Sequence, residues 1–314
     1  MRVFLAGATG AVGRQLVPQL VRDGHHVIAT TRTKAKVDAL WNLGAEPVVL
    51  DALDAAAVGE AVAKAEPDAI VHQLTALSDQ SDLKHFDRTF AQTNQLRTVG
   101  TDNLLAAARA AGVRRFVAQS FAGWPNGGGG AGPATTEDDP FDPAPPKNQR
   151  ASLAAIEHVE RAVSTAPVDG VVLRYGLLYG PGASDDWVRL LRARRLPIVG
   201  DGGGIWSMLH VDDAAAAARA ALTAPTGLYN VVDDEPAPVR EIITELAALT
   251  GSKPPMRVPV WLGRIAGGEV GVSMMTRVRA VSNAKARREL GWTPRWASWR
   301  DGFRHGLGVA GDAG

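Results

Sequence analysis

The sequence predicts an α/β protein built on a doubly wound parallel sheet, with a smaller region beyond the carboxyl edge of that sheet. Short apolar runs of strand type alternate with longer stretches of helical spacing. The runs lie at residues 3–6, 27–30, 47–50, 69–72, 115–118 and 171–174. A glycine-rich turn, GATGAVG, directly follows the first run. The chain has 314 residues, enough for one large α/β domain with an annex or for two modest domains.

The order of these segments indicates parallel strands. Helical stretches separate them, such as residues 95–111, where Leu96, Val99, Leu104 and Leu105 fall near one face. A strand, a helix and a second strand at this spacing form a right-handed crossover. Successive crossovers place helices on both sides of the sheet.

The alternation loosens after residue 175. We expect a basic helix over 187–195, a glycine turn over 200–204, a helix within 210–222 and one more strand in GLYNVVDD. The predicted sheet domain covers residues 1–175, with 209–232 returning to it. The smaller region covers 176–208 and 233–314. Ligands of open α/β sheets bind at the carboxyl edge, where this second region would lie.

Residues 124–149 form a long irregular stretch that holds WPNGGGGAG and six prolines in all by residue 146. A loop of this length inside a compact domain is usually functional or disordered. Because the stretch comes just after the carboxyl end of a strand, we expect a mobile lid in preference to a plain linker.

The composition excludes several classes of protein. The formal net charge of +1 gives no electrostatic reason to expect nucleic acid or an anionic membrane as a partner. The absence of cysteine excludes disulfides, thiolate zinc sites and cysteine nucleophiles. No apolar run approaches a membrane span, and MRVFLAGATG does not have the pattern of a signal peptide. We expect a soluble, cytoplasmic monomer or homodimer with no metal site.

The GATGAVG turn is expected to hold a pyrophosphate. Gly7 allows a tight turn, Gly10 lets the backbone approach the ligand, and Gly13 lets the helix pack on the strand. The pyrophosphate would lie on free N–H groups at the positive end of the helix. The expected contacts are Gly7, Thr9, Gly10, Ala11, Val12 and Gly13. A purely structural turn is the alternative, but a complete strand–helix–strand unit around the glycines favours dinucleotide binding.

The end of the second strand indicates which dinucleotide is bound. NAD enzymes usually have an acidic residue here, whereas this chain has Thr31 followed by Arg32, with Lys34 and Lys36 close behind. An arginine matches a 2′-phosphate, which a carboxylate would repel. We therefore predict NADP(H), with Arg32 and Lys36 as contacts; a solvated basic turn is the alternative.

Asp51 ends the third strand in VVLDALD. Its carboxylate would either accept a hydrogen bond from the adenine amine or cap the following helix, and the sequence favours neither role. Asp51 and Ala52 are included among the expected cofactor contacts.

Motifs along nearly the whole chain resemble the extended short-chain dehydrogenase/reductases, the epimerase/dehydratase-like type. They are GATGAVG, VVLDALD, VHQLTA, TNQLRTVGTDNLLAAA, RFVAQS, LRYGLLYGPG, HVDDAAAA and SNAKARRELGWTP, in this order. The resemblance implies a Rossmann-type sheet, a nicotinamide cofactor across the strand ends and a substrate cleft under the C-terminal region. It also implies further cofactor contacts at Gln73, Leu74, Thr75, Ser120, Tyr175 and Leu177, and a structural role for Asn94.

The catalytic motif of that family is missing from the expected place. Active members have Tyr-x-x-x-Lys on the helix that begins near residue 150, and the matching positions here are Gln149 and Leu153. The three tyrosines are Tyr175, Tyr179 and Tyr229. The chain therefore resembles an atypical member. Water, Ser120, Tyr175 or a hydrogen bond within the substrate would supply the proton.

These observations together predict an NADPH-dependent reductase of ketoreductase type. Positioning a nicotinamide against a carbonyl supplies much of the rate, and losing a general acid typically costs about 10²–10⁴-fold. A bulky, aromatic or polyketide-like substrate is expected from the candidate lining residues, which are Trp124, Gln149, Trp187, Trp206, Met208 and His210. The alternatives are a non-catalytic NADP(H)-sensing protein and a nucleotide-sugar epimerase or dehydratase.

Overall fold

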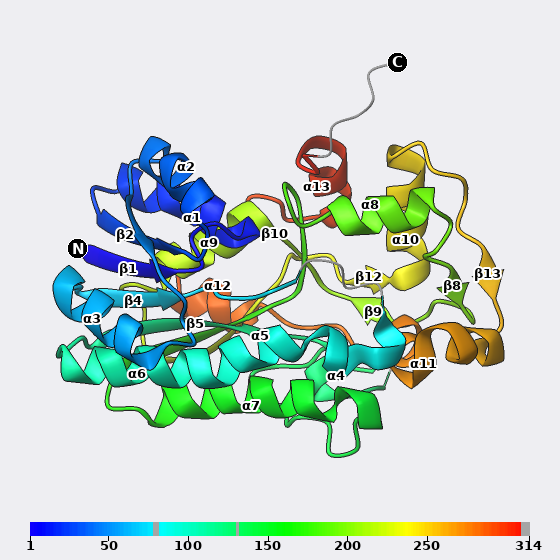
Figure 1. Ribbon diagram of the computed structural model, residues 1–314. Coiled ribbons are helices and arrows are strands. Elements are labelled where there is room, and N and C mark those ends of the chain that lie inside the picture. Colours follow the sequence, from blue (N-terminus) through cyan, green and yellow to red (C-terminus); the bar gives the residue numbers. More distant parts are fainter. Residues whose placement is uncertain (78–81, 130–131, 309–314) are drawn as a thin grey trace.

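A computed structural model describes residues 1–77, 82–129 and 132–308. Its centre is a seven-stranded sheet in which every neighbouring pair is parallel (Figure 1). In spatial order the strands are β11 (Gly227–Val231), β6 (Asp169–Tyr175), β5 (Arg115–Phe121), β4 (Ala69–His72), β1 (Arg2–Ala6), β2 (His26–Thr31) and β3 (Glu46–Val49). All the predicted strands are present. The strand order reverses between β1 and β4, the position at which open sheets of this kind bind ligands.

Helices cover both faces of the sheet, as predicted (Figure 1). One face carries α1 (Ala11–Arg22), α2 (Val37–Asn42), α9 (Val211–Ala220) and α12 (Ala284–Glu289). The opposite face carries α3 (Ala55–Ala65), α6 (Thr101–Ala110) and α7 (Arg150–Thr165). Along β1, Val3 and Leu5 join the first core, and Phe4 and Ala6 join the second. Burial on both faces explains why the strands are continuously apolar.

The helix predicted over 95–111 is longer and less regular than its pattern indicates. α5 (Ala91–Gln95) and α6 are joined by a π-helical segment, Leu96–Gly100. The wider turn changes the facing of the side chains. Leu96 and Leu104 are buried as predicted, but Val99 is exposed.

The C-terminal region lies beside the carboxyl ends of the sheet (Figure 1). Its helices are α8 (Asp185–Arg192), α10 (Val239–Leu249), α11 (Val260–Thr276) and α13 (Trp299–His305). Three short strand pairs connect them: β7 (Leu177–Tyr179) with β10 (Met208–His210), β9 (Ile205–Trp206) with β12 (Ala237–Pro238), and β8 (Ile198–Val199) with β13 (Arg257–Val258). An apolar core of its own includes Met208, Ile242 and Trp299.

The stretch expected to be a mobile lid is instead anchored where the structure describes it. The Thr135 N–H donates to the Ala280 carbonyl at 2.8 Å, and the Ser282 N–H donates back to the Thr135 carbonyl at 2.9 Å. Nearby, the Glu137 carboxylate accepts a hydrogen bond from the Asn230 N–H at 2.7 Å. These bonds join the stretch to β11 and to the chain after α11, so the expectation of a free lid is wrong for this part.

The described residues contain neither a membrane-spanning helix nor a metal-binding cluster. No helix among them is both long enough and apolar enough to cross a bilayer. No group of histidine and acidic side chains among them is arranged to hold a metal ion.

Candidate functional site

The glycine turn has the close contacts that its sequence predicts. Gly7 has φ +97°, and a Cβ there would lie 2.5 Å from the Gln73 carbonyl oxygen. A Cβ on Gly13 would lie 2.3 Å from the Gly7 carbonyl oxygen. At Gly10 the nearest atom would be 3.4 Å away, and this residue faces solvent. Gly7 and Gly13 are therefore required by the fold, whereas Gly10 leaves room for a ligand.

The beginning of α1 is free to bind an anion. No side chain caps it, and its first turn contains no acidic residue. Thr9 and Ala11 are partly exposed at this end, whereas Val12 is buried against the sheet. Uncapped N–H groups and the positive end of the helix dipole favour a phosphate here.

Gln73, at the end of β4, provides independent support for a ligand. Its side chain is buried beside the Tyr175 hydroxyl, and its amide nitrogen and oxygen make no hydrogen bond of regular geometry. A buried unpaired amide is costly unless a ligand satisfies it. Leu74 and Thr75 follow on the same strand end and are partly exposed.

His72, also at the end of β4, has a structural role. Its Nε2 lies 3.0 Å from the Thr101 hydroxyl, and its Nδ1 accepts the Leu74 N–H at 3.2 Å. Burial lowers the pKa of His72 to about 4, so the ring is neutral near pH 7.

The predicted 2′-phosphate contacts are accessible. Arg32, Lys34 and Lys36 are all exposed after β2, and Thr31 is buried. The Asp51 carboxylate accepts the Leu53 N–H at 3.0 Å, while the cap of α3 is Asp54. The alternative that Asp51 caps this helix is therefore wrong. Its neighbour Ala52 is buried.

Ser120 is committed to a buried network and does not stand free at the end of β5. Its hydroxyl donates to Glu160 Oε1 at 2.7 Å. The Glu160 carboxylate also accepts two hydrogen bonds from Arg174, at 2.8 and 2.7 Å. All three side chains are buried. This geometry does not support Ser120 as a proton donor or cofactor contact, because the fold already uses its hydroxyl.

Tyr175 also points into the core. Its hydroxyl donates to the Ala214 carbonyl of α9 at 3.1 Å, and the side chain is buried. Burial raises the pKa of Tyr175, which makes the phenol a poorer acid. Its hydroxyl is directed at α9 and lies beside the Gln73 side chain, and Tyr175 is not among the residues that line the pocket described below.

Gln149 directly precedes α7, and Leu153 follows one turn later; both are buried. Asp87 accepts the Ser152 N–H at 2.8 Å and so stabilises the start of this helix. The Asn94 amide donates to the Ser152 hydroxyl at 3.0 Å, which is consistent with a structural role for Asn94. Neither Gln149 nor Leu153 can donate and accept a proton as an acid–base pair would.

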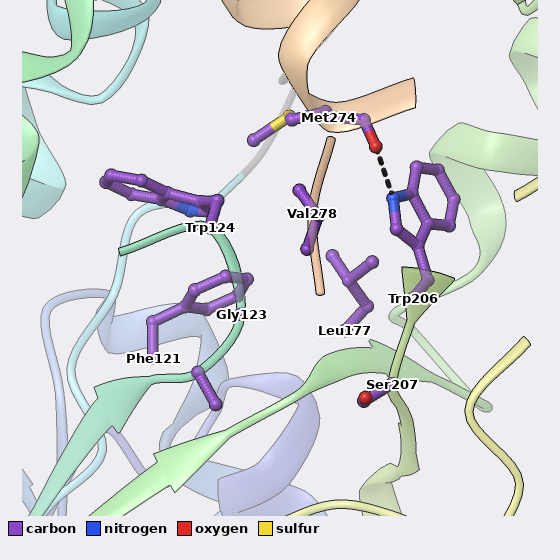
Figure 2. Close-up of a pocket in the computed structure, with 9 residues that line it drawn as sticks. Phe121, Gly123, Trp124, Leu177, Trp206, Ser207, Met274 and Val278 are labelled. Atoms are coloured by element: carbon purple, nitrogen blue, oxygen red, sulfur yellow. Dashed lines mark hydrogen bonds between the residues drawn. The ribbon is translucent and has the colours of Figure 1, made fainter. Parts of the chain in front are cut away.

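A pocket lies between the ends of β5 and β6 and the C-terminal region (Figure 2). Its cavity volume is about 40 Å³, and the pocket opens to solvent. The lining residues are Phe121, Ala122, Gly123, Trp124, Leu177, Trp206, Ser207, Met274 and Val278. Figure 2 shows Phe121 and Trp124 on one side and Trp206 on the other, with the Trp206 indole N–H bonded to the Met274 carbonyl at 2.9 Å.

The structure brings together some of the predicted substrate residues and separates others. Trp124, Trp206 and Leu177 line the pocket, and the Trp187 ring lies 5.3 Å from that of Trp206. Met208 is fully buried in the core of the C-terminal region. His210 is also buried: its Nε2 lies 2.8 Å from the Gly306 carbonyl oxygen, and its Nδ1 accepts the Asp212 N–H. Met208 and His210 therefore support the fold and do not line this pocket.

Sequence reasoning missed Phe121, Met274 and Val278. Phe121 had a usable signal, because it occupies the last position of a strand whose carboxyl end was expected at the cleft. Met274 and Val278 lie in or after α11, where no motif marks the pocket.

The chemical character of the pocket is apolar and aromatic. None of its nine lining residues has an ionisable carboxylate, amine, imidazole or phenol. Ser207 is the one hydroxyl among them, and it accepts the Val281 N–H at 2.9 Å. Such a lining favours apolar contacts, and its own side chains supply no strong acid or base.

The family model for the NAD-dependent epimerase/dehydratase family matches residues 3–231. The chain belongs to this family. Its fold and the uncapped start of α1 agree with the nicotinamide dinucleotide on which the family depends.

Similar proteins in the family include reductases. The chain is 43% identical to the 3-diazoavenalumate denitrifying reductase of a Streptomyces species, over 96% of this chain and 99% of the relative. It is 31% identical to the 2-alkyl-3-oxoalkanoate reductase of Stenotrophomonas maltophilia, over 80% of this chain and 76% of the relative. These matches make the chain an oxidoreductase of the short-chain dehydrogenase/reductase type.

The fold matches solved structures over nearly its whole length. The UDP-glucose 4-epimerase of Thermus thermophilus in complex with NAD superposes with a TM-score of 0.76 at 24% identity, covering 98% of both chains.

Proposed function

We propose that this protein is an NADPH-dependent reductase whose acceptor is an aromatic group that needs no protonation by the protein. An aromatic diazo compound is the acceptor that fits best. The observation that carries the proposal is the pocket at the strand ends, which is lined by Phe121, Trp124 and Trp206 and has no ionisable side chain. The name of the relative at 43% identity, a denitrifying reductase of a diazo compound, supports the same chemistry.

The residues present fit a phosphorylated nicotinamide dinucleotide. The start of α1 would hold the pyrophosphate, and the Gln73 amide would form hydrogen bonds to the cofactor. Arg32 and Lys36 would face the 2′-phosphate. Asp51 remains a candidate for the adenine amine. When bound, the reduced cofactor supplies two electrons and one hydrogen.

A diazo acceptor explains how the site works without an acid. A hydrogen delivered with its electron pair to the terminal nitrogen of an arenediazonium ion, Ar–N₂⁺, gives Ar–N=N–H. The C–N bond then breaks and releases N₂, while the ring carbon takes up a proton to replace the one lost from nitrogen. No oxyanion forms. The chain's own residues bind and orient the ring, and aromatic walls attract a cationic group.

A ketone is the second candidate acceptor, in line with the ketoreductase activity that the sequence predicts. The relative at 31% identity, named as a reductase of an oxoalkanoate, favours it. A ketone requires a proton at its oxygen, which here would come from water, at a cost of about 10²–10⁴-fold in rate. An epimerase or dehydratase is disfavoured because it needs a poised base, and a cofactor-sensing protein would bind NADPH without turnover.

The decisive experiment supplies a ¹⁵N-labelled ortho-hydroxyarenediazonium salt with NADPH. We expect labelled N₂ by gas mass spectrometry, one molecule for each NADPH oxidised, at a rate well above the enzyme-free reaction. A β-keto acid and a UDP-sugar are tested beside it. NADPH oxidation with the keto acid alone would replace the diazo proposal with the ketone. Tight binding without any turnover would support the sensing alternative.

Coenzyme choice is tested separately with Arg32→Glu. Reversing this charge should weaken NADPH binding about 10–100-fold and leave NADH binding nearly unchanged, since a charge-assisted bond to phosphate is worth about 1.5–3 kcal/mol. Arg161→Glu, an exposed arginine on α7, is the matched control. Equal affinity of the wild type for NADH and NADPH would refute the predicted coenzyme preference.

A further inference from the structure

The surface around the first half of α11 is unusually apolar. Ten large hydrophobic side chains in the described chain are exposed, and five of them lie between residues 256 and 265. They are Met256, Val260, Trp261, Leu262 and Ile265. Trp261 and Ile265 are 62% and 61% exposed, and one helical turn separates them, so they share a face. We call these five residues the α11 patch.

The patch is positioned by packing on its inner side. A Cβ on Gly263 would lie 2.4 Å from Val199, so the helix presses against β8 with Gly263 inward and Trp261 outward. α11 lies at the end of the molecule farthest from β1 (Figure 1). Clustered exposed apolar side chains of this kind mark interaction sites, whereas single ones are ordinary.

The charge around the patch is strongly positive, although the whole chain carries only +1. β8 pairs with β13 and contacts α11, which brings together parts of the two segments 192–201 and 251–277. These two segments contain seven basic residues and two acidic ones, a net charge of +5. The basic residues are Arg192, Arg194, Arg195, Lys253, Arg257, Arg264 and Arg277; the acidic ones are Asp201 and Glu269.

Much of this positive charge is free. Glu269 pairs with Arg264 and Arg277, at 2.8 and 2.9 Å. Lys253 and Arg257, immediately before the patch, are exposed and form no ion pair with any residue that the structure describes. The first turn of α11 contains no acidic residue, so the positive end of its dipole adds to the field.

This combination distinguishes between possible occupants. A second copy docking through the same patch would bring two surfaces of net +5 together, which is unfavourable. A surface that exposes Trp, Ile and Leu at the start of a helix, with the exposed Lys253 and Arg257 immediately before that helix, fits a membrane interface. There the apolar side chains would enter the acyl boundary and the cations would meet anionic headgroups.

We propose that the α11 patch is a peripheral docking site for anionic phospholipid membranes. α11 also supplies Met274 to the pocket, and Val270 packs in the same cluster as Trp124. Docking would therefore place the pocket near the lipid surface, from which an apolar substrate could enter. The net charge of the chain gave no reason to expect a membrane, because acidic residues elsewhere in the chain offset the positive charge of this region.

The test is co-sedimentation of the full chain with two kinds of vesicle, phosphatidylcholine alone and phosphatidylcholine mixed with phosphatidylglycerol. We expect binding to the anionic vesicles, weakened by added salt. Trp261→Ser combined with Ile265→Ser should lower the partition coefficient at least about tenfold, since each side chain loses more than about 1 kcal/mol of burial. Lys253→Gln with Arg257→Gln should reduce binding to anionic vesicles about tenfold, at about 1 kcal/mol per cation.

Trp41→Ser is the matched control, because Trp41 is 57% exposed but stands alone on α2. This variant should bind vesicles like the wild type. Equal loss in the Trp41 and Trp261 variants, or no binding of the wild type to anionic vesicles, would refute the proposal. If the wild type has the molecular mass of a dimer in solution and the Trp261 variant has that of a monomer, the patch would instead be assigned to a second copy. NADPH turnover is measured in parallel, so that failure of the reductase proposal is seen independently.

Discussion

The β1–α1–β2 unit and the β5–α7–β6 unit share one sheet, but they use their polar groups in opposite ways. In the first, the start of α1 is uncapped, and the nearby Gln73 amide lies beside the Tyr175 hydroxyl but makes no hydrogen bond of regular geometry. In the second, the Ser120 hydroxyl, the Glu160 carboxylate and the Arg174 guanidinium satisfy one another. The first unit has hydrogen-bonding groups available to a ligand, whereas the polar groups of the second unit bond to one another within the fold.

This difference shows which sequence signals transfer to function. A glycine motif acts through the backbone, whose path is fixed by strand, turn and helix. A serine or tyrosine acts through a side chain, whose partner depends on residues far away in the sequence: Glu160 lies 40 positions from Ser120, and Ala214 lies 39 positions from Tyr175. Five substitutions test the distinction, taken from the largest expected effect to the smallest.

Arg174→Met should cost the most stability. It leaves the buried Glu160 carboxylate without its partner, which typically costs about 3–5 kcal/mol in the free energy of unfolding. Urea denaturation measures the loss. NADPH affinity of the folded protein should be unchanged, since the network is not at the glycine turn. Arg161→Met, on the exposed side of α7, is the control. A normal unfolding free energy for Arg174→Met would mean that this network contributes little to the fold.

Asp233 extends the comparison to the C-terminal region. Its Oδ1 accepts the Glu235 N–H at 3.2 Å, but its buried Oδ2 has no partner. Burial raises the pKa of Asp233 to about 8, so the folded state holds a proton that the unfolded state releases. The free energy of unfolding should therefore fall as pH rises from about 4 to about 8, by at most about 1.4 kcal/mol per unit, and level off above that. Asp233→Asn should remove this part of the slope.

Chemical denaturation at several pH values checks this expectation, with Asp38→Asn, an exposed aspartate on α2, as the control. A wild-type profile that rises through the same range, unaltered in the Asp233 variant, would show that the carboxyl is ionised in the folded protein and finds a partner there.

Much of the fold could be predicted from the sequence, and only part of the site. The strands could be predicted because burial on both faces leaves them continuously apolar. The glycine turn could be predicted because no other residue fits at Gly7 and Gly13. Val99 was misplaced because a π-helical segment changes the facing without any change in composition. The pocket wall at Met274 and Val278 was unreadable because α11 exposes apolar residues as well as burying them, so its pattern marks no single inner face.

Two glycine substitutions should separate fold from ligand binding. Gly13→Ala places a Cβ 2.3 Å from the Gly7 carbonyl oxygen and should cost about 1–3 kcal/mol in unfolding free energy, together with NADPH affinity. Gly10→Ala has its nearest neighbour at 3.4 Å, so it should change stability by less than about 0.5 kcal/mol and weaken NADPH binding about tenfold. Thermal melts and NADPH titrations read the two effects. Equal behaviour of the two variants would mean that Gly10 does not face the cofactor.

Tyr175→Phe should have the smallest effect on binding and turnover, and it tests the comparison most directly. The phenol donates one hydrogen bond to the Ala214 carbonyl, so its removal should cost about 0.5–1.5 kcal/mol of stability. Turnover with the accepted substrate should stay within about twofold of wild type, because a hydroxyl committed to α9 delivers no proton to the pocket. A fall in kcat of about 10²-fold or more, with stability unchanged, would show that Tyr175 is the general acid after all. In that case the β5–α7–β6 unit, like the β1–α1–β2 unit, would have a polar group available to a ligand. The absence of an acid could then no longer be used to choose a diazo acceptor over a ketone.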